Sequence, residues 1–75
     1  MAQSKYPDAK QIGERLGKLI SKKGLTREQA AERLGYEDDR QLRRWIANGV
    51  AKIDTIIMIC EIFDIDMKEF LFPEE

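Results

Sequence analysis

Between positions 40 and 44 the chain carries four side chains that can form paired hydrogen bonds with nucleic-acid bases. These side chains are Arg40, Gln41, Arg43 and Arg44. A guanidinium group donates two parallel hydrogen bonds to guanine, and a glutamine amide forms the equivalent pair with adenine. Each such pair contributes about 1 to 3 kcal/mol of discrimination against the wrong base. These residue types therefore indicate base recognition, provided that one helix face presents them together.

Two predicted helices joined by a tight turn, within residues 26–45, would position these side chains. Thr26 and Gln29 have the spacing of a capping box that begins a helix, and Gly35 permits the left-handed conformation that ends one. The narrow apolar stripe between them consists of Ala30, Ala31 and Leu34. Because alanine side chains are small, we expect this helix to approach its neighbour closely.

The second helix of this pair begins at Asp38 or Asp39, either of which can cap it. Its buried side is predicted from spacings of three and four residues and consists of Leu42, Trp45 and Ile46. The arginines and Gln41 are then directed outward. This pattern is typical of a helix-turn-helix that places its second helix in the DNA major groove. Arg27, in the first turn of the preceding helix, is the residue expected to meet a DNA phosphate.

The charge of the chain is unevenly distributed. Residues 1–52 hold 12 Lys and Arg against 7 Asp and Glu, a net +5, whereas residues 53–75 hold 1 against 7, a net −6. A basic half can attract phosphates while an acidic half faces away. Glu37, Asp38 and Asp39 nevertheless lie beside the expected DNA surface. The alternative is that the arginines pair with these carboxylates as surface salt bridges, each contributing at most about 1 kcal/mol.

Three further helices are predicted around this pair. Residues 8–23 form the first, with Pro7 suited to its first turn and Gly24 as its stop. The fourth covers about residues 53–63, with a core face of Ile53, Ile56, Ile57, Cys60 and Phe63. The fifth covers residues 67–72, following a capping pair of Asp66 and Glu69. Because the fourth helix is apolar nearly all round, it needs a second buried contact, either with the fifth helix or with another subunit. For contact with another subunit we expect a dimer interface that consists of Met58, Ile59, Ile62 and Phe72.

Composition limits the possible classes of protein. The chain of 75 residues corresponds to one domain, residues 8–72, between a flexible tail of residues 1–7 and a short tail of residues 73–75. With no histidine and one cysteine, it lacks the usual zinc sites and nucleophile–base pairs, so we expect no enzyme activity, no metal and no cofactor. The longest apolar run, residues 56–60, is too short to cross a membrane, and no signal-like segment precedes it. A cytoplasmic protein is predicted.

The order of motifs resembles the Cro/XRE family of helix-turn-helix DNA-binding domains, which are lambda-repressor-like. The resemblance covers about residues 12–72 and is carried by IGERLGKLISKKGLTREQAAERLGY, by LRRW followed by NG, and by IDTIIMICEIFDIDMKEFLF. It implies an all-α bundle of five short helices, commonly dimeric, and a transcriptional repressor, phage regulator or antitoxin. Arg27 matches a DNA-contacting position of the family. The exposed recognition-helix positions of the family match Arg40, Gln41, Arg43 and Arg44.

Two hypotheses about function follow. The first is a sequence-specific regulator of transcription, a repressor, that binds double-stranded DNA as a homodimer on a two-fold-related operator. The second is a protein-interaction module of the same fold, an antitoxin or the partner of an anti-repressor, that binds a protein such as a toxin and has little DNA binding. The acidic residues beside the recognition helix and the apolar surface of the fourth helix support the second hypothesis.

Overall fold

Five α-helices make up most of residues 7–73, which are the residues that the computed structural model describes. The helices are α1 (Ala9–Lys22), α2 (Arg27–Arg33), α3 (Arg40–Asn48), α4 (Ile53–Ile62) and α5 (Met67–Leu71). The all-α fold predicted from the sequence is confirmed. The two predicted tails lie outside the described residues, except for Pro7 and Pro73.

Local side-chain hydrogen bonds set where the helices begin. The predicted capping box is present at α2, where the Thr26 hydroxyl accepts from the Gln29 amide at 3.0 Å and the Gln29 side chain accepts from the Thr26 amide at 2.9 Å. Asp8 and Gln11 form a second such box at α1, which the sequence interpretation had missed. Pro7 therefore lies before the cap, and its predicted place in the first turn of the helix was wrong.

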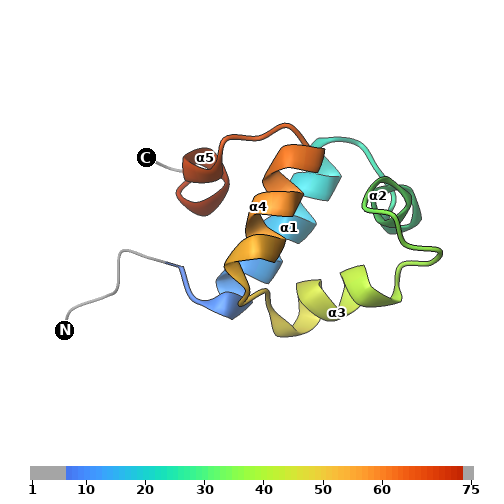
Figure 1. Cartoon of the computed structure of the whole chain (residues 1–75), viewed down its shortest axis with the longest axis horizontal. Helices are drawn as coiled ribbons and strands as arrows, with labels where there is room; N and C mark the ends of the chain where they lie inside the picture. Colours follow the sequence, from blue (N-terminus) through green and yellow to red (C-terminus); the bar gives the residue numbers. More distant parts are fainter. Residues whose placement is uncertain (1–6, 74–75) are drawn as a thin grey trace.

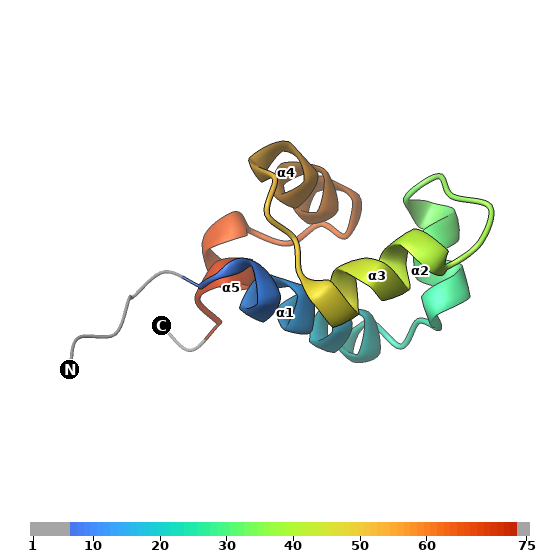
Figure 2. The same cartoon turned by 90° about the horizontal axis from the view of Figure 1, so that it is seen from below.

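The other three helices are arranged around α1 and α4, which lie one above the other. In Figure 1, α4 crosses in front of α1, and Figure 2, seen from below, separates the two helices into different layers. In both views α3 and α5 lie on opposite sides of this pair, while α2 lies beside the start of α3. Arg15 of α1 donates a hydrogen bond from Nη1 to the carbonyl oxygen of Leu71 at 2.6 Å, which ties α5 to α1.

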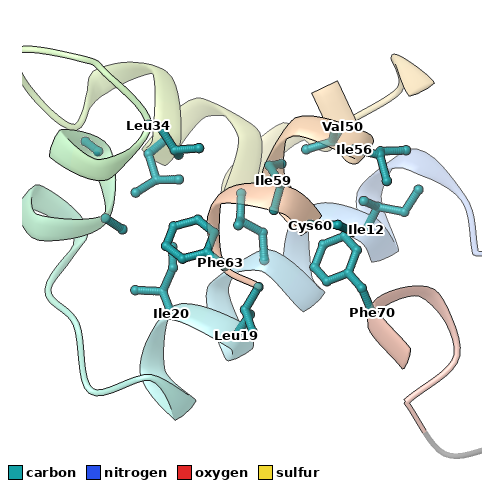
Figure 3. Packing of buried hydrophobic residues seen from close by; sticks show 14 residues of the cluster. Ile12, Leu19, Ile20, Leu34, Val50, Ile56, Ile59, Cys60, Phe63 and Phe70 are labelled. Atoms are coloured by element: carbon teal, nitrogen blue, oxygen red, sulfur yellow. The ribbon is translucent and has the colours of Figure 1, made fainter. Parts of the chain in front are cut away.

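The hydrophobic core fills the space between α1 and α4 and extends to both ends. Phe63, the residue just after α4, lies near Ile20 of α1 in Figure 3. At the other end, Phe70 of α5 points toward Cys60 and Ile12 (Figure 3). The core therefore joins the first helix to the last two, and the helix-turn-helix pair of α2 and α3 contributes Ala30, Ala31 and Leu42 to it.

The buried face of α4 differs from the predicted one. Ile56, Cys60 and Phe63 are buried as expected, but Ile53 and Ile57 are 61% and 41% exposed. Ile59, expected at a dimer interface, has an exposed fraction of 0% and belongs to the core of the monomer. When apolar residues occur on every side of a helix, the sequence pattern does not show which side is buried. Packing against α1 and α5 decides it instead.

The end of α3 is held against the start of α1 by a close backbone approach. Val50 donates its amide hydrogen to the carbonyl oxygen of Ala9 at 2.9 Å. Gly49, the residue just before, adopts φ 114° and ψ 168°, a conformation that is essentially restricted to glycine. Farther along α1, Gly13 is buried so close to the Trp45 carbonyl that a Cβ atom could not be accommodated. These contacts fix the position of α3 on the molecule.

Candidate nucleic-acid interface

The α2–turn–α3 unit presents α3 with one side buried and the other exposed. Ala30 and Ala31 are fully buried where α2 meets the core, as their small size predicts. In α3, Leu42 is fully buried, whereas Trp45 and Ile46 are half-buried and pack against the core. The buried side of α3 is thus the predicted one, although two of its three residues remain partly accessible.

An aromatic contact holds the turn between α2 and α3 against α3. The ring of Tyr36 lies edge-on to that of Trp45, with 5.9 Å between centroids and 77° between planes. The backbone amide of Tyr36 also donates to the carbonyl oxygen of Ala31 at 3.0 Å, which closes the end of α2. Because both contacts join the turn to the two helices, they limit how far α3 can shift relative to α2.

Four arginines that the sequence analysis singled out share one open groove. The groove is lined by Arg27, Arg40, Arg43, Arg44, Ile46 and Ala47. All four arginines are exposed. Two helices bring them together, because Arg27 begins α2 and the other three follow one face of α3 at spacings of three and four residues. A concentration of positive charge of this kind attracts phosphate groups.

The structure adds two groove residues, Ile46 and Ala47, and separates one predicted residue from the groove. Ile46 had been predicted only as part of the buried side of α3. Ala47, three residues after Arg44 on the same helix face, was missed, although its spacing from the arginines could have revealed it. A small apolar side chain in this position can contact a thymine methyl group. Gln41 is half-buried and lies at the edge of the exposed face, next to the side that carries Trp45. Base reading by Gln41 stays a prediction.

Arg40 pairs with a carboxylate of the acidic turn. Its Nε and Nη2 atoms donate to Oδ2 of Asp38 at 3.1 and 3.0 Å, and its backbone amide donates to Oδ1 at 3.1 Å. The side-chain hydrogen bond from Arg40 is the main cause that lowers the pKa of Asp38, with the backbone hydrogen bond next. The same interaction raises the pKa of Arg40. Asp39 occupies the N-cap position of α3, but its side chain forms no capping hydrogen bond. Asp38, one residue earlier, accepts the first backbone amide of the helix instead.

The other arginines have different surroundings. Arg43 Nη1 lies 3.6 Å from Oδ1 of Asp39, one helical turn earlier, which is close enough for an ion pair but not for a hydrogen bond. Within residues 7–73, Arg27, Arg44 and Glu37 form no ion pair. The alternative of surface salt bridges is thus realised for Arg40 and Arg43, whereas no carboxylate among the described residues pairs with Arg27 or Arg44.

The remaining predicted interface residues lie on α4 and after α5. Met58, Ile62 and Phe72 are all half-buried within their own chain, and the first two pack against the core. Ile53 and Ile57 are the most exposed apolar side chains of α4. Ile53 and Ile57 form one apolar edge of the exposed side of α4, and Met58 and Ile62 form the other. The exposed acidic residues Asp54 and Glu61 lie between these two edges. Apolar surface is therefore available on α4, but it is not where the sequence placed most of it.

Other kinds of site have little support in the described part of the chain. No group of three or more His, Cys, Asp or Glu side chains in residues 7–73 is placed to hold a metal ion. Burial raises the pKa of the Cys60 thiol, with a smaller effect from Asp66, so the reactive thiolate is disfavoured. None of the described helices has the length and apolar character needed to cross a membrane.

Comparison with known proteins identifies the family. The model of a helix-turn-helix family matches residues 16–70, which is well over half of the 75-residue chain. No curated protein and no solved structure matches the chain significantly. The matched region runs from the middle of α1 to α5 and includes the whole arginine-lined groove. The five-helix fold agrees with a lambda-repressor-like domain, and this family consists of DNA-binding regulatory domains that are typically not enzymes. The chain belongs to the Cro/C1-type, XRE-like helix-turn-helix family.

Proposed function

We propose that this protein is a sequence-specific regulator of transcription, a repressor, that inserts α3 into the major groove of double-stranded DNA. The observation that carries the proposal is the groove in which Arg27, Arg40, Arg43 and Arg44 lie together. A repressor needs only to occupy its operator, and an exposed arginine-lined groove supports that role. We place its action in the cytoplasm, as the sequence predicts.

The arginines would divide the work of binding between phosphates and bases. Arg27 lies on α2, beside the recognition helix, which suits contact with the DNA backbone. Arg43 and Arg44 point outward from the middle of α3, where a helix in the major groove reaches base edges. Ala47 would contact the methyl group of a thymine. Binding would therefore combine a salt-dependent phosphate term with a base-specific term.

The proposed active form is a homodimer on a two-fold-related operator. The exposed side chains of Ile53 and Ile57 support an interface on α4, with the half-buried Met58, Ile62 and Phe72 as its other apolar candidates. A two-fold axis through such an interface would set the two α3 helices about 34 to 36 Å apart, which is one turn of DNA. The operator would then have two inverted half-sites at that spacing.

Selection from a random duplex pool, at low and at moderate salt, tests the proposal. We expect enrichment of a two-fold-symmetric site whose affinity falls as the salt concentration rises. Arg43→Ala should weaken binding to that site by roughly 5-fold to 150-fold, because 1 to 3 kcal/mol of base discrimination is removed.

Lys18→Ala is the matched control for Arg43→Ala. Lys18 is also exposed and basic, but it lies on α1 and does not line the arginine groove. It should therefore affect binding to the selected site much less than Arg43→Ala. Equal affinities of the two variants for the site would refute the assignment of α3 as the recognition helix.

A second candidate function is binding of a protein, as in an antitoxin or the partner of an anti-repressor. The specific observation in its favour is that Arg40 and Arg43 already face Asp38 and Asp39, while Ile53 and Ile57 expose apolar surface. A protein of this kind would show no retention on duplex DNA even at low salt. It would instead form a stable complex with a defined protein partner.

A further inference from the structure

The carboxylate of Asp38 holds Arg40 by its backbone and its side chain at the same time. Oδ1 accepts the backbone amide of Arg40 at 3.1 Å, and Oδ2 accepts from Nε and Nη2 at 3.1 and 3.0 Å. The start of α3 and the direction of the first recognition-helix side chain are therefore fixed by one group. Such charge-assisted contacts are stronger than hydrogen bonds between neutral groups.

The atoms that Asp38 leaves unused are those that read a base. A guanidinium group has five N–H donors in a planar fork. Asp38 takes the Nε–H and one hydrogen of Nη2, which leaves both hydrogens of Nη1 and the second hydrogen of Nη2. The Arg40 side chain is 82% exposed despite the contact, so this free end is accessible from the groove. Two donors on neighbouring nitrogens are what guanine O6 and N7 accept.

We infer that Asp38 is a specificity-determining residue of the proposed interface, because it orients the free end of Arg40 toward a guanine in the major groove. The inference rests on the proposed DNA-binding function. Arg40 then loses less side-chain freedom when it binds, because Asp38 has already restricted that freedom. A carboxylate in the acidic turn thus has a role beyond repelling phosphate.

The second arginine–carboxylate pair differs in the way that matters for this role. Arg43 Nη1 and Asp39 Oδ1 are 3.6 Å apart, which is too far for a hydrogen bond. Their electrostatic attraction therefore does not fix the orientation of the guanidinium plane. Glu37 lies in the same turn and has no ion pair within residues 7–73. The chain therefore contains a carboxylate that orients an arginine and, one residue earlier, a carboxylate that does not.

Asp38→Asn is the variant that separates orientation from charge. Its side-chain oxygen can still accept the Arg40 amide and cap α3, but the NH₂ group that replaces the other oxygen cannot accept from the guanidinium. Glu37→Gln is the matched control, since it removes the same charge from the same turn without touching an arginine. Both variants should bind non-specific duplex DNA slightly more tightly, because each loses one negative charge near the phosphates.

The measurement is a set of dissociation constants on the selected site and on versions of it with each base pair replaced in turn. We expect one G·C pair whose replacement weakens the wild type and Glu37→Gln but has little effect on Arg40→Ala. In Asp38→Asn the discrimination at that pair should fall by up to about fivefold, because an exposed arginine–carboxylate pair contributes at most about 1 kcal/mol. Unchanged discrimination in Asp38→Asn, or an equal loss in Glu37→Gln, would overturn the inference.

A measurement on the free protein distinguishes the orientation of Arg40 by Asp38 from the proposed DNA-binding function. In the NMR spectrum of the free protein, the Nε–H of Arg40 should exchange slowly with water in the wild type and in Glu37→Gln, and rapidly in Asp38→Asn. Rapid exchange in the wild type would overturn the orientation by Asp38 even if the protein binds DNA. Slow exchange with no binding to any duplex at low salt would mean that the proposed function had failed, and a role in DNA specificity with it, although the contact exists.

Discussion

Replacement of Gly49 by alanine tests how the structure positions the recognition helix. Gly49 follows α3 directly, and the next residue, Val50, donates its amide hydrogen to Ala9 of α1. A Cβ atom at position 49 would lie 2.6 Å from the carbonyl oxygen of Ala9, 2.7 Å from its carbon and 2.8 Å from the amide nitrogen of Lys10. All three are backbone atoms, so no side chain can move aside to relieve the overlap.

The cost of Gly49→Ala has two parts. The first is backbone strain, since φ 114° with ψ 168° lies in a region that costs other residues about 1 to 3 kcal/mol. The second is overpacking against α1, which typically costs about 1 to 3 kcal/mol. Together they give about 2 to 6 kcal/mol. A domain of this size has only about 3 to 5 kcal/mol of net stability, so the substitution should remove much or all of it.

Gly35→Ala is the matched control for this experiment. Gly35 also has a positive φ, of 92°, but a Cβ atom there would meet nothing within 4 Å. Its cost is backbone strain alone, about 1 to 2 kcal/mol. Urea unfolding, followed by far-UV circular dichroism, gives the free energy of unfolding of both variants and the wild type. If Gly49→Ala lost no more stability than Gly35→Ala, the close approach of α3 to α1 would be refuted.

Two further substitutions test the exposed side of α4 and the residue that follows its C-terminal cap. Ile57→Lys should convert the proposed dimer to a monomer in sedimentation experiments. The melting temperature of the monomer should stay nearly unchanged, because Ile57 is 41% exposed and its loss opens no cavity in the core. A wild type that stays monomeric at high concentration would contradict the dimer. Asp64→Gly should raise stability by about 1 kcal/mol, or the melting temperature by about 4 to 8 °C. Asp64 follows α4 with φ 54°, where glycine is unstrained, and its negative charge lies at the negative end of the helix dipole. Asp64→Asn, which removes only the charge, separates the two contributions, and a less stable Asp64→Gly would show that neither argument holds.

The candidate site was predictable to the extent that it depends on one helix. The spacing of Leu42, Trp45 and Ile46 directs Arg40, Arg43 and Arg44 outward whatever α3 packs against, and the structure places all three arginines in one groove. The pairing of Arg40 with Asp38 was not predictable in the same way. Three neighbouring carboxylates were available, and only the conformation of the turn decides which one reaches the guanidinium.

The sequence by itself determined where α2 begins and ends, because those signals act over three or four residues. Thr26 with Gln29 begins α2, and Gly35, with its positive φ, follows its end as predicted. The tertiary structure alone decided which side of α4 is buried: Ile59 went into the core and Ile57 remained at the surface. Capping depends on bonds between near neighbours in the chain, whereas the buried side of an all-apolar helix depends on the helices that happen to cover it. For the same reason the contact of Gly49 with Ala9, which seats the recognition helix, has no counterpart in any local pattern.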